Sequence, residues 1–186
     1  MKESTGMAIV NTNTEIIETE RLRLRKFTDS DIPDMLQNWI ADPAVQSRYG
    51  EPTYTDALAV KDLLANWAGQ YRWAIVWKKT NENVGQVSFC RLYEADRTAE
   101  VEYCIGRAFW NRGIVSEALT AFISYIFAHT PVQTLEAFHQ IQNPASGRVL
   151  QKAGMMAVEN ILRFAEQDKP PEGAICYVIT KGQFDH

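Results

Sequence analysis

The stretch AFWNRGIVSEALTAFISYIF, residues Ala108 to Phe127, decides how this chain folds. From Ile114 onward its apolar residues cover much of a helix circumference, which predicts a helix at the centre of the core. The strand-like run VEYCIG precedes it, and Gly113 stands directly before the helix. Such a glycine either makes a turn or lets an anion reach the bare N–H groups of a helix start. Neither GxGxxG nor GxxxxGK[ST] surrounds it, so the glycine alone does not decide between these two roles.

Strands and helices alternate on both sides of this stretch. Before it, the patterns predict a strand over 16–27 and then a helix that begins at a capping box formed by Thr28 and Asp31 and ends at Pro43. A loop containing Arg48 and Tyr49 follows, and then a second helix over 55–71. A hairpin of strands 72–79 and 84–94 and a third strand, 98–106, follow. After it come a strand over 132–141, a helix over 143–154 with Pro144 at its start and Gly154 at its C-cap, and strands over 156–167 and 174–184.

The chain length and composition favour one domain. With 186 residues, 46% of them hydrophobic, the chain can bury one sizeable core and needs no second. We expect a frayed tail over 1–14, which is polar and small, and a single domain over 15–186. The fold class is α/β (α+β), with a mixed central sheet of about seven strands flanked by about four helices.

Charge and cysteine content bound the function. A net charge of −4 does not indicate binding to nucleic acid or to an anionic membrane. The three cysteines are widely spaced and lack metal-ligand spacing, so we expect buried thiols, no metal site and a reducing compartment. No apolar run has the length of a signal peptide or a membrane span, and we therefore expect a cytoplasmic protein.

Three segments taken in order carry a family resemblance: ETERLRLRKFTDSD, AEVEYCIGRAFWNRGIVSEAL and NPASGRVLQKAGM. Together they resemble the GNAT superfamily of acetyl-CoA-dependent N-acetyltransferases, and within it the RimJ/RimL-like branch. The resemblance covers roughly residues 18–184. It implies the GNAT fold, acetyl-CoA as cosubstrate and a primary amine as acceptor, without metal.

The resemblance also implies which residues hold the coenzyme. The family's pyrophosphate loop, [QR]-x-x-G-x-[GA], aligns with Trp110 to Val115. The pantetheine arm is expected to lie along the strand before the loop, where that strand splays from the next one and an N–H can stabilise the oxyanion. The implied residues are Cys104 or Ile105 at the thioester carbonyl, Asn111, Arg112, Gly113, Val115 and Ser116 at the pyrophosphate, and Asn143 and Ser146 at the pantetheine and its sulfur.

Acetyl transfer to an amine requires that the amine lose a proton, directly or through water, because an alkylamine is protonated at neutral pH. Glu100 and Glu102 lie two residues apart on one face of a strand and are the candidate bases. Both could equally be solvated positions on a polar strand face. Ser146, the third candidate catalytic residue, would stabilise the departing thiolate, or would only satisfy a backbone amide of the first helical turn. A lone His139 and the packed thiol of Cys104 are more typical of structural residues.

The resulting hypothesis is a cytoplasmic N-acetyltransferase, monomer or homodimer, in which an amine attacks the thioester directly. The acceptor is either a protein N-terminal α-amine, as the branch resemblance suggests, or a small-molecule amine. The alternative is a non-catalytic acyl-CoA-binding or regulatory module with the same fold, in which Glu100→Gln and Ser146→Ala would leave function untouched. An unrelated α/β nucleotide-binding domain is a third alternative, disfavoured by the missing fingerprints.

Overall fold

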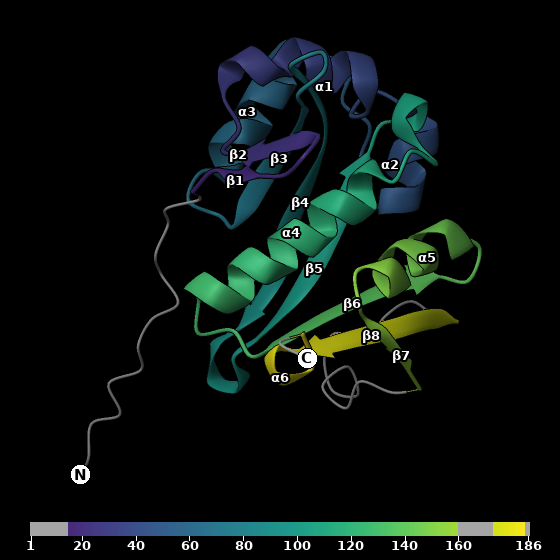
Figure 1. Cartoon of the computed structure of the whole chain (residues 1–186). Coiled ribbons are helices and arrows are strands. Elements are labelled where there is room, and N and C mark those ends of the chain that lie inside the picture. Colours follow the sequence, from purple (N-terminus) through teal and green to yellow (C-terminus); the bar gives the residue numbers. More distant parts are fainter. Residues whose placement is uncertain (1–14, 160–172, 185–186) are drawn as a thin grey trace.

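The computed structural model describes residues 15–159 and 173–184, and its centre is one eight-stranded mixed sheet (Figure 1). The strand order is β1-β2-β3-β4-β5-β6-β8-β7, and every neighbouring pair is antiparallel except β5 and β6, which are parallel. The strands are β1 Ile17–Glu18, β2 Leu22–Arg25, β3 Arg72–Trp77, β4 Glu82–Tyr93, β5 Thr98–Ile105, β6 Thr134–Gln140, β7 Met156–Val158 and β8 Ala174–Thr180.

Helices cover both faces of this sheet. They are α1 Ile32–Asn38, α2 Pro43–Tyr49, α3 Ala57–Trp67, α4 Ile114–His129, α5 Pro144–Lys152 and α6 Lys181–Phe184. On β5, Val101 and Ile105 join the core under α4, whereas Cys104 joins the cluster formed with α1 and α3. Since successive strand side chains point to opposite faces, α4 and the α1–α3 layer lie on opposite sides of the sheet. The α4 side also carries α5 (Figure 1).

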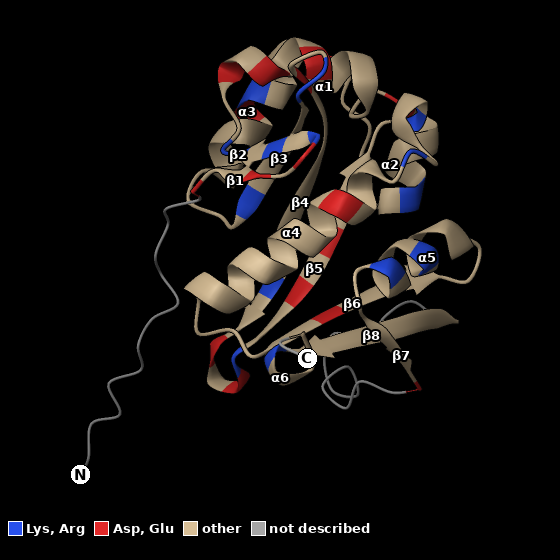
Figure 2. Cartoon of the chain, in the orientation of Figure 1, with Lys and Arg blue, Asp and Glu red and all other residues tan. Residues whose placement is uncertain are grey.

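Helix α4 is the central core helix that its apolar pattern predicts. Seven of its residues are buried, among them Phe122, which meets Trp73 and Phe89 of the sheet edge to face at ring distances of 5.3 and 5.4 Å. Figure 2 shows α4 almost free of charged residues. Burial of so much apolar surface is the main source of stability in a fold of this size, because it is the dominant favourable contribution to folding.

The parallel strands β5 and β6 separate soon after they pair. Their register covers only Thr98–Thr134, Ala99–Leu135 and Glu100–Glu136, although both strands continue further. Beyond Glu100 the facing edges of β5 and β6 therefore carry backbone groups that do not pair with each other. The sheet opens here into a V between β5 and β6, as the resemblance implies.

Most predicted elements are present, and the α/β fold class is confirmed. The Asp31 carboxylate accepts a hydrogen bond from the Thr28 N–H at 2.8 Å, so the capping box is real. Pro144 begins α5, and Gly154 follows that helix at φ +88°. The α4, β3 and β5 segments also fall where the patterns place them.

Three predicted boundaries differ from the structure, and two predicted segments lie wholly or mostly outside the described residues. The predicted strand 16–27 is two short antiparallel strands, because the chain turns back between Glu18 and Leu22. The segment expected as a loop contains α2, since Pro43 begins a new helix rather than only ending the previous one. The last strand ends at Thr180, and α6 follows it. The tail 1–14 and most of the predicted strand 156–167 lie outside the described residues.

Candidate active site

The loop before α4 has the backbone of an anion-binding site. Asn111 and Gly113 both have positive φ, 60° and 72°, and they flank Arg112. All three residues are exposed. Alternating right- and left-handed backbone turns N–H groups into a concavity that binds anions, and the positive end of the α4 dipole adds to it. The guanidinium of Arg21 donates to the Arg112 carbonyl at 2.9 Å and is ion-paired with Glu117 at 2.6 Å, which fixes the loop to the first turn of α4.

The other pyrophosphate candidates have separate environments. The side chain of Val115 is half-buried and packs against the core, so it does not fill the loop. Ser116 is half-buried, and its hydroxyl makes no hydrogen bond to a described residue. Trp110 donates from its indole to the Ile105 carbonyl at 2.9 Å and so ties the loop to the end of β5.

Of the two thioester candidates on β5, the backbone directions favour Ile105. The Gly106 N–H donates to Val84 of β4 at 2.8 Å. Because N–H groups alternate along a strand, the Cys104 N–H also points toward β4, and the Ile105 N–H points toward the V. The Cys104 thiol is buried among α1 and α3, and burial raises its pKa, so it is a packed, protonated thiol.

Across the V, α5 presents Asn143 and Ser146. Asn143 is the N-cap residue of α5, yet its side chain makes no capping hydrogen bond and is bonded to no described residue. The Ser146 hydroxyl oxygen lies 2.6 Å from the phenol oxygen of Tyr103 on β5, which also lies 3.0 Å from the Ser146 carbonyl. Tyr103 and Ser146 thus bridge the two sides of the V.

Close packing places α5 against β6 and β8. A Cβ on Gly147 would lie 2.5 Å from Nε2 of His139 and 2.9 Å from the phenol oxygen of Tyr177, so only glycine fits there. His139 is buried, with Nδ1 2.8 Å from the Gln140 carbonyl, as expected of a structural histidine. This contact sets how far α5 and Ser146 stand from the sheet.

On the opposite face, Glu102 belongs to a polar network within an otherwise apolar layer. One carboxylate oxygen, Oε1, accepts from Arg72 and from Ser88, each at 2.8 Å. Arg72 also donates to Gln86 at 2.6 Å and lies 4.2 Å over the ring of Trp67. Arg72 is nine-tenths buried, and its charge is neutralised by Glu102.

Glu100 has a different environment from Glu102. Its side chain is only 6% exposed and pairs with Arg91 at 3.3 Å. Burial raises the pKa of Glu100, against the opposing effects of Cys90 and Arg91. The two glutamates share a strand face as predicted, but Glu100 lies where β5 is still paired with β6, about 7 Å further from the open end of the V.

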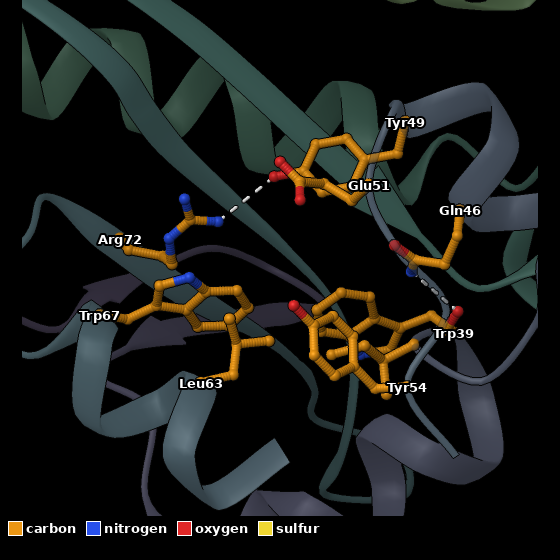
Figure 3. Close-up of a pocket in the computed structure, with 9 residues that line it drawn as sticks. Trp39, Gln46, Tyr49, Glu51, Tyr54, Leu63, Trp67 and Arg72 are labelled. Atoms are coloured by element: carbon orange, nitrogen blue, oxygen red, sulfur yellow. Dashed lines mark hydrogen bonds between the residues drawn. The ribbon is translucent and has the colours of Figure 1, made fainter. Parts of the chain in front are cut away.

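A pocket opens beside this network between the sheet and the α1–α3 layer (Figure 3). Aromatic rings form most of its wall, with Tyr49 and Glu51 on one side, Trp67 and Arg72 on another, and Tyr54 near Trp39. The full lining is Trp39, Ile40, Gln46, Tyr49, Glu51, Tyr54, Leu63, Trp67 and Arg72. Of the two residues predicted to lie in a loop before the second helix, Tyr49 lines the pocket, whereas Arg48 stacks 4.6 Å over Trp110.

Sequence reasoning missed three residues of this site. Arg72 begins a strand, and nothing in its sequence context distinguishes it from a surface arginine. Tyr103 follows Glu102 on the strand, and only its contact with Ser146 shows that it belongs to the site. Glu51 follows the unpredicted helix α2, so its position could not be derived until that helix was known.

The profile of the acetyltransferase (GNAT) domain matches residues 21–156, which is most of the chain. The chain belongs to the GNAT acetyltransferase family. It is therefore an acetyl-transferring enzyme of a family that uses acetyl-CoA. The match includes β2 to α5 and hence both sides of the V.

Relatives of this GNAT chain support the assignment. It is 30% identical over 161 residues to an uncharacterized N-acetyltransferase, p20, of Bacillus licheniformis, covering 83% of this chain and 89% of that protein. It is also 30% identical over 88 residues to the ribosomal-protein-serine acetyltransferase of Escherichia coli (strain K12), covering 47% of this chain and 49% of that one. The RimJ/RimL-like resemblance is thereby confirmed.

Solved structures share the fold. A GNAT-family acetyltransferase from Bacillus anthracis superposes with a TM-score of 0.76 at 23% identity, covering 90% of this chain and 99% of that chain. RimL, a ribosomal-protein alpha-N-acetyltransferase solved in complex with coenzyme A, gives a TM-score of 0.69 at 20% identity, covering 89% and 98%. These likenesses show the GNAT fold of the present chain.

Two kinds of feature are absent from the described residues. Within 15–159 and 173–184, no three histidine, cysteine or acidic side chains lie together as metal ligands would. In the same ranges no helix has both the length and the apolar character needed to cross a bilayer.

Proposed function

We propose that this GNAT protein transfers the acetyl group of acetyl-CoA to a primary amine, by direct attack of the amine on the thioester. The acceptor is a protein N-terminal α-amine or a small-molecule amine. The V between β5 and β6, with an anion-binding loop at its open end, is the observation that carries the proposal. An extended pantetheine arm can hydrogen-bond to the edge of β5, and a pyrophosphate fits the exposed loop of Asn111 to Gly113.

The residues around the V have distinct roles in this proposal. The N–H groups of the loop and the α4 N-terminus, with Arg112 and Ser116, bind the pyrophosphate. The side-chain amide of Asn143 binds the pantetheine. The Ile105 N–H donates to the carbonyl oxygen as negative charge develops on it, which is the usual largest contribution to catalysis of acyl transfer. The Ser146 hydroxyl stabilises the departing thiolate.

The acceptor is proposed to enter from the α1–α3 side. Glu102 accepts a hydrogen bond from Arg72, which lines the pocket, and its negative charge attracts the ammonium form of the amine. We assign this role to Glu102 rather than Glu100, because Glu100 is buried beside Arg91 and is further from the open end of the V.

Thiol release from acetyl-CoA, measured with a panel of amines and N-terminal peptides, tests the proposal. Turnover with one acceptor class, reduced in Glu102→Gln and in Ser146→Ala, is the expected result. Tight coenzyme binding without turnover on any acceptor would favour the non-catalytic acyl-CoA-binding module. Absence of acetyl-CoA binding would overturn the proposed function.

A further inference from the structure

Glu51 is a carboxylate without a partner on the wall of the aromatic pocket. It is exposed, and its carboxylate receives neither a hydrogen bond nor an ion pair from the described residues. Arg72, the cation on the same wall, is already engaged by Glu102 and Gln86 and stacked on Trp67. Glu51 is therefore free to pair with a cation that enters the pocket.

The rest of the pocket defines what kind of cation fits. Its walls are mainly apolar or aromatic side chains, namely Trp39, Ile40, Tyr54, Leu63 and Trp67. Aromatic faces attract an ammonium group and pack against hydrocarbon. These side chains offer no carboxylate that could pair with a second ammonium group and few hydrogen-bond partners for hydroxyl groups. Burying such polar groups in the pocket would therefore cost free energy. A monoamine with an apolar body matches these walls, whereas a polyamine or an aminoglycoside does not.

We propose that Glu51 binds the ammonium group of the acceptor in this pocket and takes its proton, and that the acceptor is a primary amine on a short apolar body. This inference rests on the proposed function and names the substrate class of the same site. Glu51 and Glu102 have different roles in this proposal: Glu102 is held in place by Arg72 and Ser88, and Glu51, without such donors, exchanges the proton.

The electrostatics of Glu51 agree with that role. Burial, and then the negative charge of Glu102, raise the pKa of Glu51, while Arg72 acts in the opposite direction. Tyr49, which lies beside Glu51 in Figure 3, is an uncharged neighbour, because burial raises the pKa of its phenol well above the ordinary value. A carboxylate with a raised pKa is a better proton acceptor than an ordinary surface glutamate.

The proposed step balances. Glu51 takes a proton from the ammonium group and leaves a neutral amine. The nitrogen lone pair of this amine attacks the carbonyl carbon of the acetyl thioester and forms the N–C bond. The C–S bond then breaks, and its electron pair passes to sulfur. The second nitrogen proton is lost as the amide forms and protonates the thiolate, and Glu51 returns its own proton to solvent.

Binding of a probe amine tests the inference without turnover. Trp39 and Trp67, two of the five tryptophans, line the pocket, so titration with isoamylamine should change the tryptophan fluorescence. We expect Glu51→Gln to weaken isoamylamine binding at least about tenfold, the scale of a lost charged hydrogen bond. Isoamyl alcohol should bind more weakly than the amine and be insensitive to the substitution. The control is Glu94→Gln, an exposed glutamate between β4 and β5 outside the pocket, which should change neither.

Measurement of turnover is the second test of the inference. We expect thiol release to be at least about tenfold faster, in kcat/KM, with isoamylamine than with spermidine, and to fall in Glu51→Gln while acetyl-CoA affinity stays unchanged. If Glu51→Gln binds isoamylamine within about twofold of the wild type, or if spermidine is the better substrate, the inference is wrong even though acetyl transfer stands. Failure of acetyl-CoA to bind would instead remove the proposed function, and the fluorescence titration would still decide whether Glu51 forms an amine site.

Discussion

Gly113 shows how a single backbone angle prepares a site. Its φ of 72° belongs to the left-handed region, and a Cβ placed there would meet only Nη2 of Arg21, at 3.5 Å. The space beside Gly113 is therefore open toward the expected pyrophosphate, and the conformation rather than crowding requires glycine. Gly69, at φ +80° with nothing within 4 Å, has the same conformation away from the loop and is a matched control.

Gly113→Ala and Gly69→Ala are predicted to lose similar stability, about 1–2 kcal/mol each, because both force a Cβ into the left-handed conformation. Only Gly113→Ala should also weaken acetyl-CoA binding, by roughly tenfold, since its methyl group projects into the coenzyme loop and strains the N–H concavity. Titration calorimetry with acetyl-CoA on the two folded variants makes the comparison. Equal coenzyme affinities would place the pyrophosphate elsewhere.

Tyr103 is predicted to act through Ser146. When the phenol donates to the serine oxygen 2.6 Å away, the serine hydrogen is free to point at the departing thiolate. Tyr103→Phe should lower kcat by about threefold to tenfold, the range for one hydrogen bond, with KM for acetyl-CoA unchanged. In the double variant with Ser146→Ala the loss should equal that of Ser146→Ala alone. Additive losses in kcat would mean that Tyr103 acts independently of the serine.

At the scale of elements, α5 is held at its distance from the sheet by one close contact. Gly147→Ala would place a methyl group 2.5 Å from His139 and 2.9 Å from Tyr177, which must push α5 outward. We predict a loss of about 1–3 kcal/mol, the usual cost of overpacking, and a lower acetyl-CoA affinity because Asn143 and Ser146 move with the helix. Gly182→Ala, in α6 with no atom within 4 Å, is the control. Urea denaturation showing equal midpoints for the two variants would contradict this packing.

Helix α2 explains which elements the sequence predicts poorly. A proline after a helical pattern ends that helix, but it is also the best residue for the first position of another. Here Asp42 caps α2 by accepting from the Ala44 N–H at 2.9 Å, and Gly50 ends it at φ +85°. Both signals are visible in the sequence: Asp42 and Pro43 stand at the start of the seven-residue helix, and Gly50 stands at its end. So short a helix, however, has no repeating pattern of apolar residues that would confirm it. Long periodic elements such as α4 carried no such ambiguity.

For the molecule as a whole, the coenzyme side of the site follows from the sequence far better than the acceptor side. Asn111, Gly113, Asn143 and Ser146 were predicted from the family resemblance, and the structure places the first two in the loop before α4 and the other two at the start of α5. The proposed acceptor pocket combines side chains from α2, α3 and β3 with the segments that follow α1 and α2. Its geometry depends on how these elements pack, which local patterns do not determine, and so Arg72 and Glu51 became visible only in three dimensions.

The buried Glu100 makes a prediction about the stability of the whole fold. Its pKa is raised by burial in the folded protein, so folding favours the protonated carboxyl. As pH rises through the unfolded-state pKa and then the folded one, ionisation lowers the free energy of unfolding, and above the folded pKa the full cost is present. Glu100→Gln removes this cost, while Arg91, itself 44% exposed, stays in contact with solvent after its buried partner loses the charge.

Glu100→Gln should therefore be more stable than the wild type at pH 7, and the difference should shrink as pH falls toward 4, where the wild-type carboxyl is protonated as well. Urea midpoints at the two pH values measure this, with Glu94→Gln as the exposed control. Because Glu100 is assigned no contact with the acceptor, thiol release by the variant should stay close to the wild-type rate. A variant that is less stable at pH 7 and inactive would show instead that the Glu100 charge is needed by the site, and would return the role of base to this residue.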